Sequence, residues 1–320
     1  MAKSAISPGG STGKILSDGG QLLALALFPV GHSLTPGPAF QRIGPAMGWF
    51  RCVFAICAIS LGSLALAKEI ALTFDDAPCQ ESYASLAEVR RMNEKILTAL
   101  RRRRVPAAIF ANENKLFWRG ERAERVAILE RWIDAGHEIG NHTASHGKLS
   151  IVGAEAFCRD VVAGERTANA LLAMRGRRMR FFRFPALDRG QGEERQRVER
   201  FLRQRGYAVA PITVDPRDWE FNARQRPLRE RGMAAEAFLV RQQFLHFLRE
   251  QLAAVKDLPR NEVLLLHLCT LTADCIDDIL AMVRSLGMVP CTLERALLDS
   301  ASPAPAVFRP TRARRSPRLF

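Results

Sequence analysis

The stretch that decides the fold covers residues 70–78 and reads IALTFDDAP. Its first five residues are apolar, β-branched or aromatic apart from one threonine, which is typical of a strand buried on both faces. Asp75 and Asp76 end this strand, and Ala-Pro turns the chain away. Two adjacent carboxylates repel each other unless a positive charge lies nearby, and a divalent cation commonly supplies it. The stretch therefore predicts either a metal-binding strand end or a helix cap or solvated turn.

Strands and helices alternate on the C-terminal side of this stretch. Further strands are expected at 105–110, 137–142, 180–184, 207–214, 262–266 and 288–289. Helices are expected at 85–103, 121–135, 150–174, 196–205, 234–255, 272–286 and from 293. This alternation implies an α/β fold with a parallel sheet, and so many units imply a closed or nearly closed barrel.

The charge of the chain argues against a nucleic-acid partner. The 320 residues are 48% hydrophobic and carry a formal net charge of +14, but residues 68–300 account for only about +6 of it. The densest basic run, Arg101 to Arg104, ends an expected helix, where the helix dipole favours cations. Seven cysteines without a CxxC spacing exclude a zinc ribbon.

The two ends of the chain differ from the part between them. Residues 1–46 are rich in Gly, Ser and Pro and receive no fold; they are a candidate mis-called extension if Met47 is the true start. Residues 47–67 have a charged start, an apolar centre and a small-x-small site, which predicts a secretory signal peptide and an exported protein. The alternative is a membrane anchor. Residues 68–300 form the predicted catalytic domain, and the Pro-rich basic tail at 301–320 is expected to be disordered.

Polar side chains follow one expected strand after another. In parallel α/β folds the chemistry lies at the carboxyl ends of the strands, so we expect these side chains at one edge of the sheet. They are Asp75 and Asp76, His142 and His146, Arg183, Asp218 with Trp219, and His267.

His142 and His146 are four residues apart, which puts both imidazoles on one face if the segment turns helically. Two histidines, one carboxylate and a position left for water are typical of a catalytic zinc site, although HxxxH alone is as often structural. A second carboxylate then serves as base for water activated by the metal. His267 fits the acid that expels the leaving group, the alternative being a core histidine. Arg183 can keep the base ionised, and Asp218 can hold His267 protonated.

Five ordered motifs resemble those of the polysaccharide deacetylases, the chitin and peptidoglycan deacetylase family. They are TFDD at 73–76, HxxxH at 142–146, RFP at 183–185, DW at 218–219 and LLLH at 264–267. The resemblance covers about residues 69–298. It implies a distorted (β/α) barrel with about seven parallel strands. It also implies an enzyme that uses a divalent metal to remove acetyl groups from N-acetylated or O-acetylated polysaccharide.

The resemblance also implies a role for each residue of the motifs. Asp75 is the general base and His267 the general acid, supported by Arg183 and Asp218 respectively. One divalent ion, for which Zn2+ is favoured, is assigned to Asp76, His142 and His146. The substrate pocket is assigned to Trp219, Pro185 and Ala186.

Three features depart from the family pattern and leave the acetylated glycan open. Ala77 replaces the usual glycine, and Ala186 replaces an aromatic residue, although its backbone N–H can still serve an oxyanion. The long segment before His267 contains a basic run at 224–231, a candidate lid. Two other hypotheses remain: an inactive carbohydrate-binding protein on the same fold, and a membrane-tethered envelope protein. A disulfide between Cys79 and Cys269 is a further hypothesis for an exported protein.

Overall fold

The computed structural model describes residues 68–81 and 84–298, and the structural statements below concern these residues. The described residues belong to one compact unit of the chain. The predicted extension, leader and basic tail lie outside the described residues. No helix within the described ranges is both long and apolar enough to cross a membrane.

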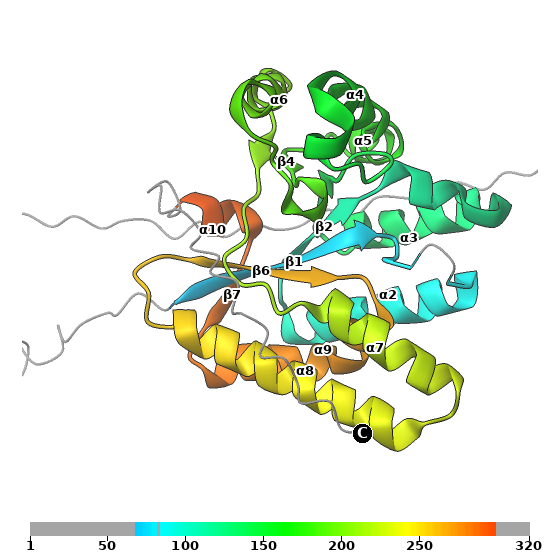
Figure 1. Ribbon diagram of the computed structural model, residues 1–320, viewed down its shortest axis with the longest axis vertical. Coiled ribbons are helices and arrows are strands. Elements are labelled where there is room, and N and C mark those ends of the chain that lie inside the picture. Colours follow the sequence, from blue (N-terminus) through cyan, green and yellow to red (C-terminus); the bar gives the residue numbers. More distant parts are fainter. Residues whose placement is uncertain (1–67, 82–83, 299–320) are drawn as a thin grey trace, which may run out of the picture. The chain divides into compact units, whose positions relative to one another are not determined.

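Seven strands form one sheet in which every pairing is parallel. The order is β5-β4-β3-β2-β1-β6, and β7 pairs with the first residues of β1. Figure 1 shows β1 and β6 side by side near the middle of the view. The strands are β1 (Glu69–Ala77), β2 (Ala107–Ala111), β3 (Glu138–Asn141), β4 (Phe181–Phe182), β5 (Ala208–Val209), β6 (Glu262–His267) and β7 (Val289–Cys291).

The segment that follows β5 brings the two ends of the sheet toward each other. The Ala210 N–H donates to the Phe182 carbonyl of β4 at 2.8 Å, and Val214 forms an isolated parallel bridge with Leu264 of β6. The expected strand at 207–214 is therefore a true strand only at β5, and its remainder connects the edges. The curled parallel sheet confirms the predicted distorted barrel of about seven strands.

Helices flank the sheet, and four of them, α2, α7, α8 and α9, lie below β1 and β6 in Figure 1. The helices are α2 (Leu86–Arg103), α3 (Arg122–Asp134), α4 (Leu149–Ala163), α5 (Arg166–Ala173), α6 (Gly192–Gln204), α7 (Asp218–Glu230), α8 (Ala234–Val255), α9 (Thr270–Ser285) and α10 (Leu293–Leu298), with the 3-10 segments η1 (Glu113–Gly120) and η2 (Pro185–Leu187).

One helical prediction was wrong, and the candidate lid is part of a helix. The single helix expected at 150–174 is α4 followed by α5, and Gly153, with φ +76°, interrupts the first of them. The candidate lid at 224–231 lies almost entirely within α7. Arg224 donates to Gln243 of α8 at 2.7 Å, and Arg229 pairs with Asp274 of α9 at 2.5 Å. Because these contacts tie α7 to its neighbours, the basic run is a packed helix face.

The boundaries of α2 follow from its own sequence. Ser85 caps the helix, and its side chain and that of Glu88 form a reciprocal capping box. At the other end Arg104 takes a left-handed conformation, and Arg102 and Arg103 pair with Asp277 of α9. The interpretation of the arginine run as a helix end is confirmed.

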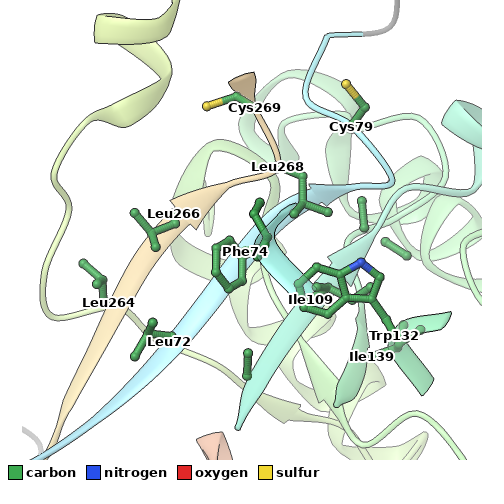
Figure 2. Packing of buried hydrophobic residues seen from close by; sticks show 14 of the residues in the cluster. Leu72, Phe74, Cys79, Ile109, Trp132, Ile139, Leu264, Leu266, Leu268 and Cys269 are labelled. Carbon is green, nitrogen blue, oxygen red and sulfur yellow. The ribbon is translucent and has the colours of Figure 1, made fainter. Parts of the chain in front are cut away.

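The core lies on the side of the sheet that the β1 apolar residues face. Phe74 is fully buried, and its ring centroid lies 5.7 Å from that of Trp132 in α3. The Trp132 indole N–H donates to Asn93 Oδ1 of α2 at 2.8 Å, so the one polar atom of this large side chain is satisfied. Figure 2 shows Phe74 lying between the leucines of β6 and the β2 residue Ile109. This packing fixes the strand on which the paired aspartates end.

Candidate metal centre and active site

The sheet brings the predicted residues to one edge. Asp75 and Asp76 end β1, His142 follows β3, and Arg183 follows β4. Asp75 is the register partner of His267, the last residue of β6. Because paired residues of parallel strands point to the same face, the candidate base and acid share one side of the sheet.

Three of these residues form a cluster able to hold a metal ion. Ligand atoms of Asp76, His142 and His146 lie within 4.8 Å of one another. The His142 Nδ1–H donates to the Arg183 carbonyl at 2.9 Å, which leaves Nε2 as the free lone pair. Burial is the main cause that lowers the pKa of His146 to about 4, so the His146 imidazole is neutral at pH 7. Two imidazoles and one carboxylate are a donor set that fits a zinc-type ion.

Asp76 is presented by an unusual backbone. The β1–β2 register shifts between Phe74 and Ala77, and Asp76 has a left-handed φ of +68°. Its Oδ1 accepts no hydrogen bond in the described part of the chain, although the Lys115 ammonium lies 3.0 Å away. Burial alone would raise the pKa of Asp76, but Lys115 and the neighbouring histidines outweigh it and lower that pKa. A buried, ionised and incompletely bonded carboxylate is what a cation site requires.

The loop that carries the two histidines is not helical, so the reason given for their spacing was wrong. Thr143 and His146 have φ of +62° and +61°, and the imidazole centroids still lie 4.9 Å apart. The turn is held by side chains that sequence reasoning missed. Asn112 Nδ2 donates to the His142 carbonyl at 2.6 Å, and Asn141 Oδ1 accepts from the Thr143 N–H at 2.8 Å.

A cation supports Asp75. The fully buried Arg183 donates from Nη1 to Asp75 Oδ1 at 2.8 Å and to Thr73 Oγ1 at 2.7 Å. Its guanidinium carbon lies 4.3 Å from the Phe110 ring centroid, which adds a cation–π contact. The other carboxylate oxygen, Oδ2, lies 3.6 Å from His142 Nε2. The Asp75 carboxylate is thereby fixed beside the ligand cluster.

A carboxylate likewise holds His267. The buried Asp218 accepts from His267 Nδ1–H at 2.7 Å, from the His267 backbone N–H at 2.7 Å and from Thr272 Oγ1 at 2.6 Å. Burial alone would lower the pKa of His267, but the charge and hydrogen bond of Asp218 outweigh it and raise that pKa to about 9. His267 is therefore protonated at neutral pH, as a general acid must be. Thr272 is a further residue that the motifs did not reveal.

The predicted pocket residues lie on two segments beside these groups. Trp219 is 43% exposed in the first turn of α7, directly after Asp218. Pro185 is buried, whereas Ala186 is exposed and has a left-handed φ of +50° within η2. The aromatic side chain that Ala186 replaces would therefore have been at the surface.

The hypothesis of a disulfide between Cys79 and Cys269 was wrong. Both are buried free thiols, and in Figure 2 the Cys269 sulfur points away from Cys79. The Cys269 thiol donates instead to Thr272 Oγ1 at 3.2 Å.

Comparison with known proteins matches residues 65–210 to the family model described as polysaccharide deacetylase. The match includes both aspartates, both histidines and Arg183, but it stops before Asp218 and His267. The placement of those two residues therefore rests on the register and hydrogen bonds described above.

Two curated relatives are deacetylases. A peptidoglycan-N-acetylglucosamine deacetylase of Bacillus cereus is 30% identical over 153 residues, covering 48% of this chain and 46% of that protein. A chitooligosaccharide deacetylase of Sinorhizobium fredii is 29% identical over 154 residues, covering 48% and 60%. The chain thus spans about half the length of the curated relatives it matches.

Solved structures share the fold. A peptidoglycan N-acetylglucosamine deacetylase in complex with 4-naphthalen-1-yl-N-oxidanyl-benzamide has a TM-score of 0.51 at 22% identity, covering 71% of this chain and 87% of that one. A peptidoglycan deacetylase from Bacillus subtilis has a TM-score of 0.50 at 20% identity, covering 74% and 93%. A carbohydrate esterase family 4 pseudoenzyme from Bacillus anthracis also reaches 0.50 at 18% identity, covering 71% and 66%.

Proposed function

We propose that this chain, which contains a polysaccharide deacetylase domain, is a metal-dependent hydrolase that removes acetyl groups from an N-acetylated or O-acetylated polysaccharide. One observation supports this most strongly. The ligand cluster of Asp76, His142 and His146 is accompanied by a cation-bound carboxylate, Asp75, and a carboxylate-bound histidine, His267. Binding alone would need the ligands but not the two proton carriers.

The residues divide the chemistry between them. A bound divalent metal supplies Lewis-acid polarisation of the acetyl carbonyl and lowers the pKa of water. Asp75 takes the proton of the attacking water, while the Arg183 guanidinium holds the carboxylate in place through a hydrogen bond. His267 gives its proton to the departing nitrogen as the C–N bond breaks, so the sugar leaves as a free amine. Asp218 fixes the ring and stabilises its positive charge.

The donor set also favours one class of metal. Imidazole nitrogens suit Zn2+ and neighbouring transition metals, whereas Mg2+ and Ca2+ prefer sites built from oxygen. Because the donor set has two imidazoles and one carboxylate, Zn2+ is the ion we propose.

The substrate and location follow from different observations. The two curated relatives are named for peptidoglycan and chitooligosaccharide, which supports an acetylated glycan as substrate here. The leader pattern at 47–67 supports export to the periplasm or the medium, with a membrane tether if that segment is not cleaved. Trp219, with Pro185 and Ala186, is proposed to contact the sugar.

Acetate release tests the proposal. Purified protein is treated with a chelator, and acetate is measured with N-acetylglucosamine oligomers and with peptidoglycan before and after Zn2+ is added back. We expect activity that the chelator abolishes and Zn2+ restores, and we expect His142→Ala to lose metal and activity together. A protein that binds metal stoichiometrically but turns over none of these acetylated glycans would favour the carbohydrate-binding pseudoenzyme.

A further inference from the structure

We propose that Lys115 is a specificity-determining residue of the metal centre, an internal cation that competes with the metal for Asp76. The inference rests on the proposed ligand set of Asp76, His142 and His146, but not on the substrate or on the proton carriers. Lys115 belongs to none of the sequence motifs described above.

The contacts of Lys115 show that it is not a solvated surface lysine. It lies in η1, the segment that directly follows β2, and its side chain is only 14% exposed. Its ammonium lies 3.0 Å from Asp76 Oδ1 and donates to the Gln80 carbonyl at 3.0 Å. The contacts with Asp76 and Gln80 therefore hold the Lys115 ammonium beside the carboxylate proposed to bind the metal.

The same oxygen, Asp76 Oδ1, lies beside a histidine of the ligand cluster. It is 3.5 Å from His146 Nε2 and accepts no well-directed hydrogen bond among the described residues. An ion held by Asp76, His142 and His146 would therefore be close to the Lys115 ammonium. Like charges at such a distance repel, and the repulsion is strong where burial weakens solvent screening.

The charge balance of the centre shows what this repulsion does. Asp75 is already neutralised by Arg183, and both imidazoles are proposed as neutral ligands. Among the described residues of the ligand cluster, Asp76 is then the single anion available to a dication, and Lys115 offsets it. Ions that depend on carboxylate charge, such as Mg2+ and Ca2+, lose most of their attraction. An ion that binds imidazole nitrogen loses less. Lys115 thus weakens all divalent binding and selects for Zn2+-type ions.

Direct titration of metal binding tests this inference without any substrate. Metal-free wild type, Lys115→Met and Lys115→Arg are titrated with Zn2+ in competition with a chromophoric chelator, and Ca2+ binding is followed by calorimetry. Lys95→Met is the matched control, because Lys95 pairs with the surface residue Asp274 between α2 and α9. We expect Lys115→Met to bind Zn2+ at least about tenfold more tightly, with a larger gain for Ca2+. We expect Lys115→Arg and Lys95→Met to stay within about threefold of wild type.

Three results would overturn the inference. Unchanged Zn2+ affinity in Lys115→Met would show that the ammonium does not compete, and weaker binding would show that it orients Asp76 for the metal. If the wild type binds no Zn2+, both the inference and the proposed ligand set fail. Unchanged affinity in Lys115→Met would overturn only the inference. Thermal melting of each metal-free variant checks the fold. If Lys115→Met melts early, Lys115→Gln replaces it with the same expected gain.

Discussion

Asp75 and His267 are register partners on β1 and β6, with Asp75 bonded to Arg183 and His267 to Asp218. Each proton carrier is therefore positioned by the sheet and by a hydrogen-bonded partner of opposite charge. Because both stand at the ends of buried strands, their separation does not depend on a mobile loop. The predictions below follow from this arrangement.

Asp218→Asn should move the alkaline limit of activity downward. The folded-state pKa of His267 is raised to about 9, so the proton is present at neutral pH and is lost as the pH rises through that value. Without the Asp218 charge and hydrogen bond, the two largest causes that raise this pKa are lost, while burial still lowers it. We expect the alkaline limb of the pH–kcat profile to shift down by about two pH units or more.

Thr272→Val is the matched control for that change. It removes one hydrogen bond to Asp218 Oδ2 but leaves the charge in place. We expect its alkaline limb to move by well under one pH unit, since Asp218 still bonds His267. If Asp218→Asn and Thr272→Val gave the same profile as wild type, Asp218 would not be the cause of the raised pKa.

Asn112→Ala should weaken metal binding without removing a ligand. The buried Asn112 amide holds the His142 carbonyl at 2.6 Å and so fixes the start of the histidine turn. Partners of this kind around metal ligands typically contribute about tenfold in affinity. We expect the Zn2+ Kd, measured by chelator competition, to rise by about that factor. Asn169→Ala, which removes a bond to the Met179 N–H away from the ligands, should leave the Kd unchanged.

The mature protein should begin near Lys68. The leader pattern at 47–67 ends in a small-x-small site, and β1 starts directly afterwards at Glu69. N-terminal sequencing of the exported protein checks this cleavage. A product that stays in the cytoplasm with Met1 intact would contradict it.

The polar residues at the strand ends could be predicted from the sequence, because each directly follows a recognisable apolar run. The apolar run before Asp75 and the run before His267 each identify a buried strand, and parallel strands meet at one edge. Turn geometry could not be predicted in the same way. The spacing of the histidine pair would put both on one face of a helical turn, whereas Thr143 and His146 adopt left-handed backbone. A hydrogen bond from the distant Asn112 and a local one to Asn141 help to stabilise it.

Residues that act through distant contacts were also missed. Lys115 reaches Asp76 from the segment after β2, and Thr272 reaches Asp218 from α9. Neither has a sequence spacing that links it to its partner. Likewise, the sequence left the basic run at 224–231 as a candidate lid, because its partners on α8 and α9 are far along the chain.

The central claim is that Asp75 and His267 are separate proton carriers, and leaving-group dependence tests it most directly. Asp75→Asn should cost about 10²–10⁴ in turnover on both an N-acetylated glycan and an activated aryl acetate, with metal retained. His267→Ala should cost a similar factor on the amide, because the amine leaves poorly without a proton. It should cost much less on the aryl acetate, whose leaving group departs unaided. A loss in His267→Ala that is equal on amide and ester would contradict the account.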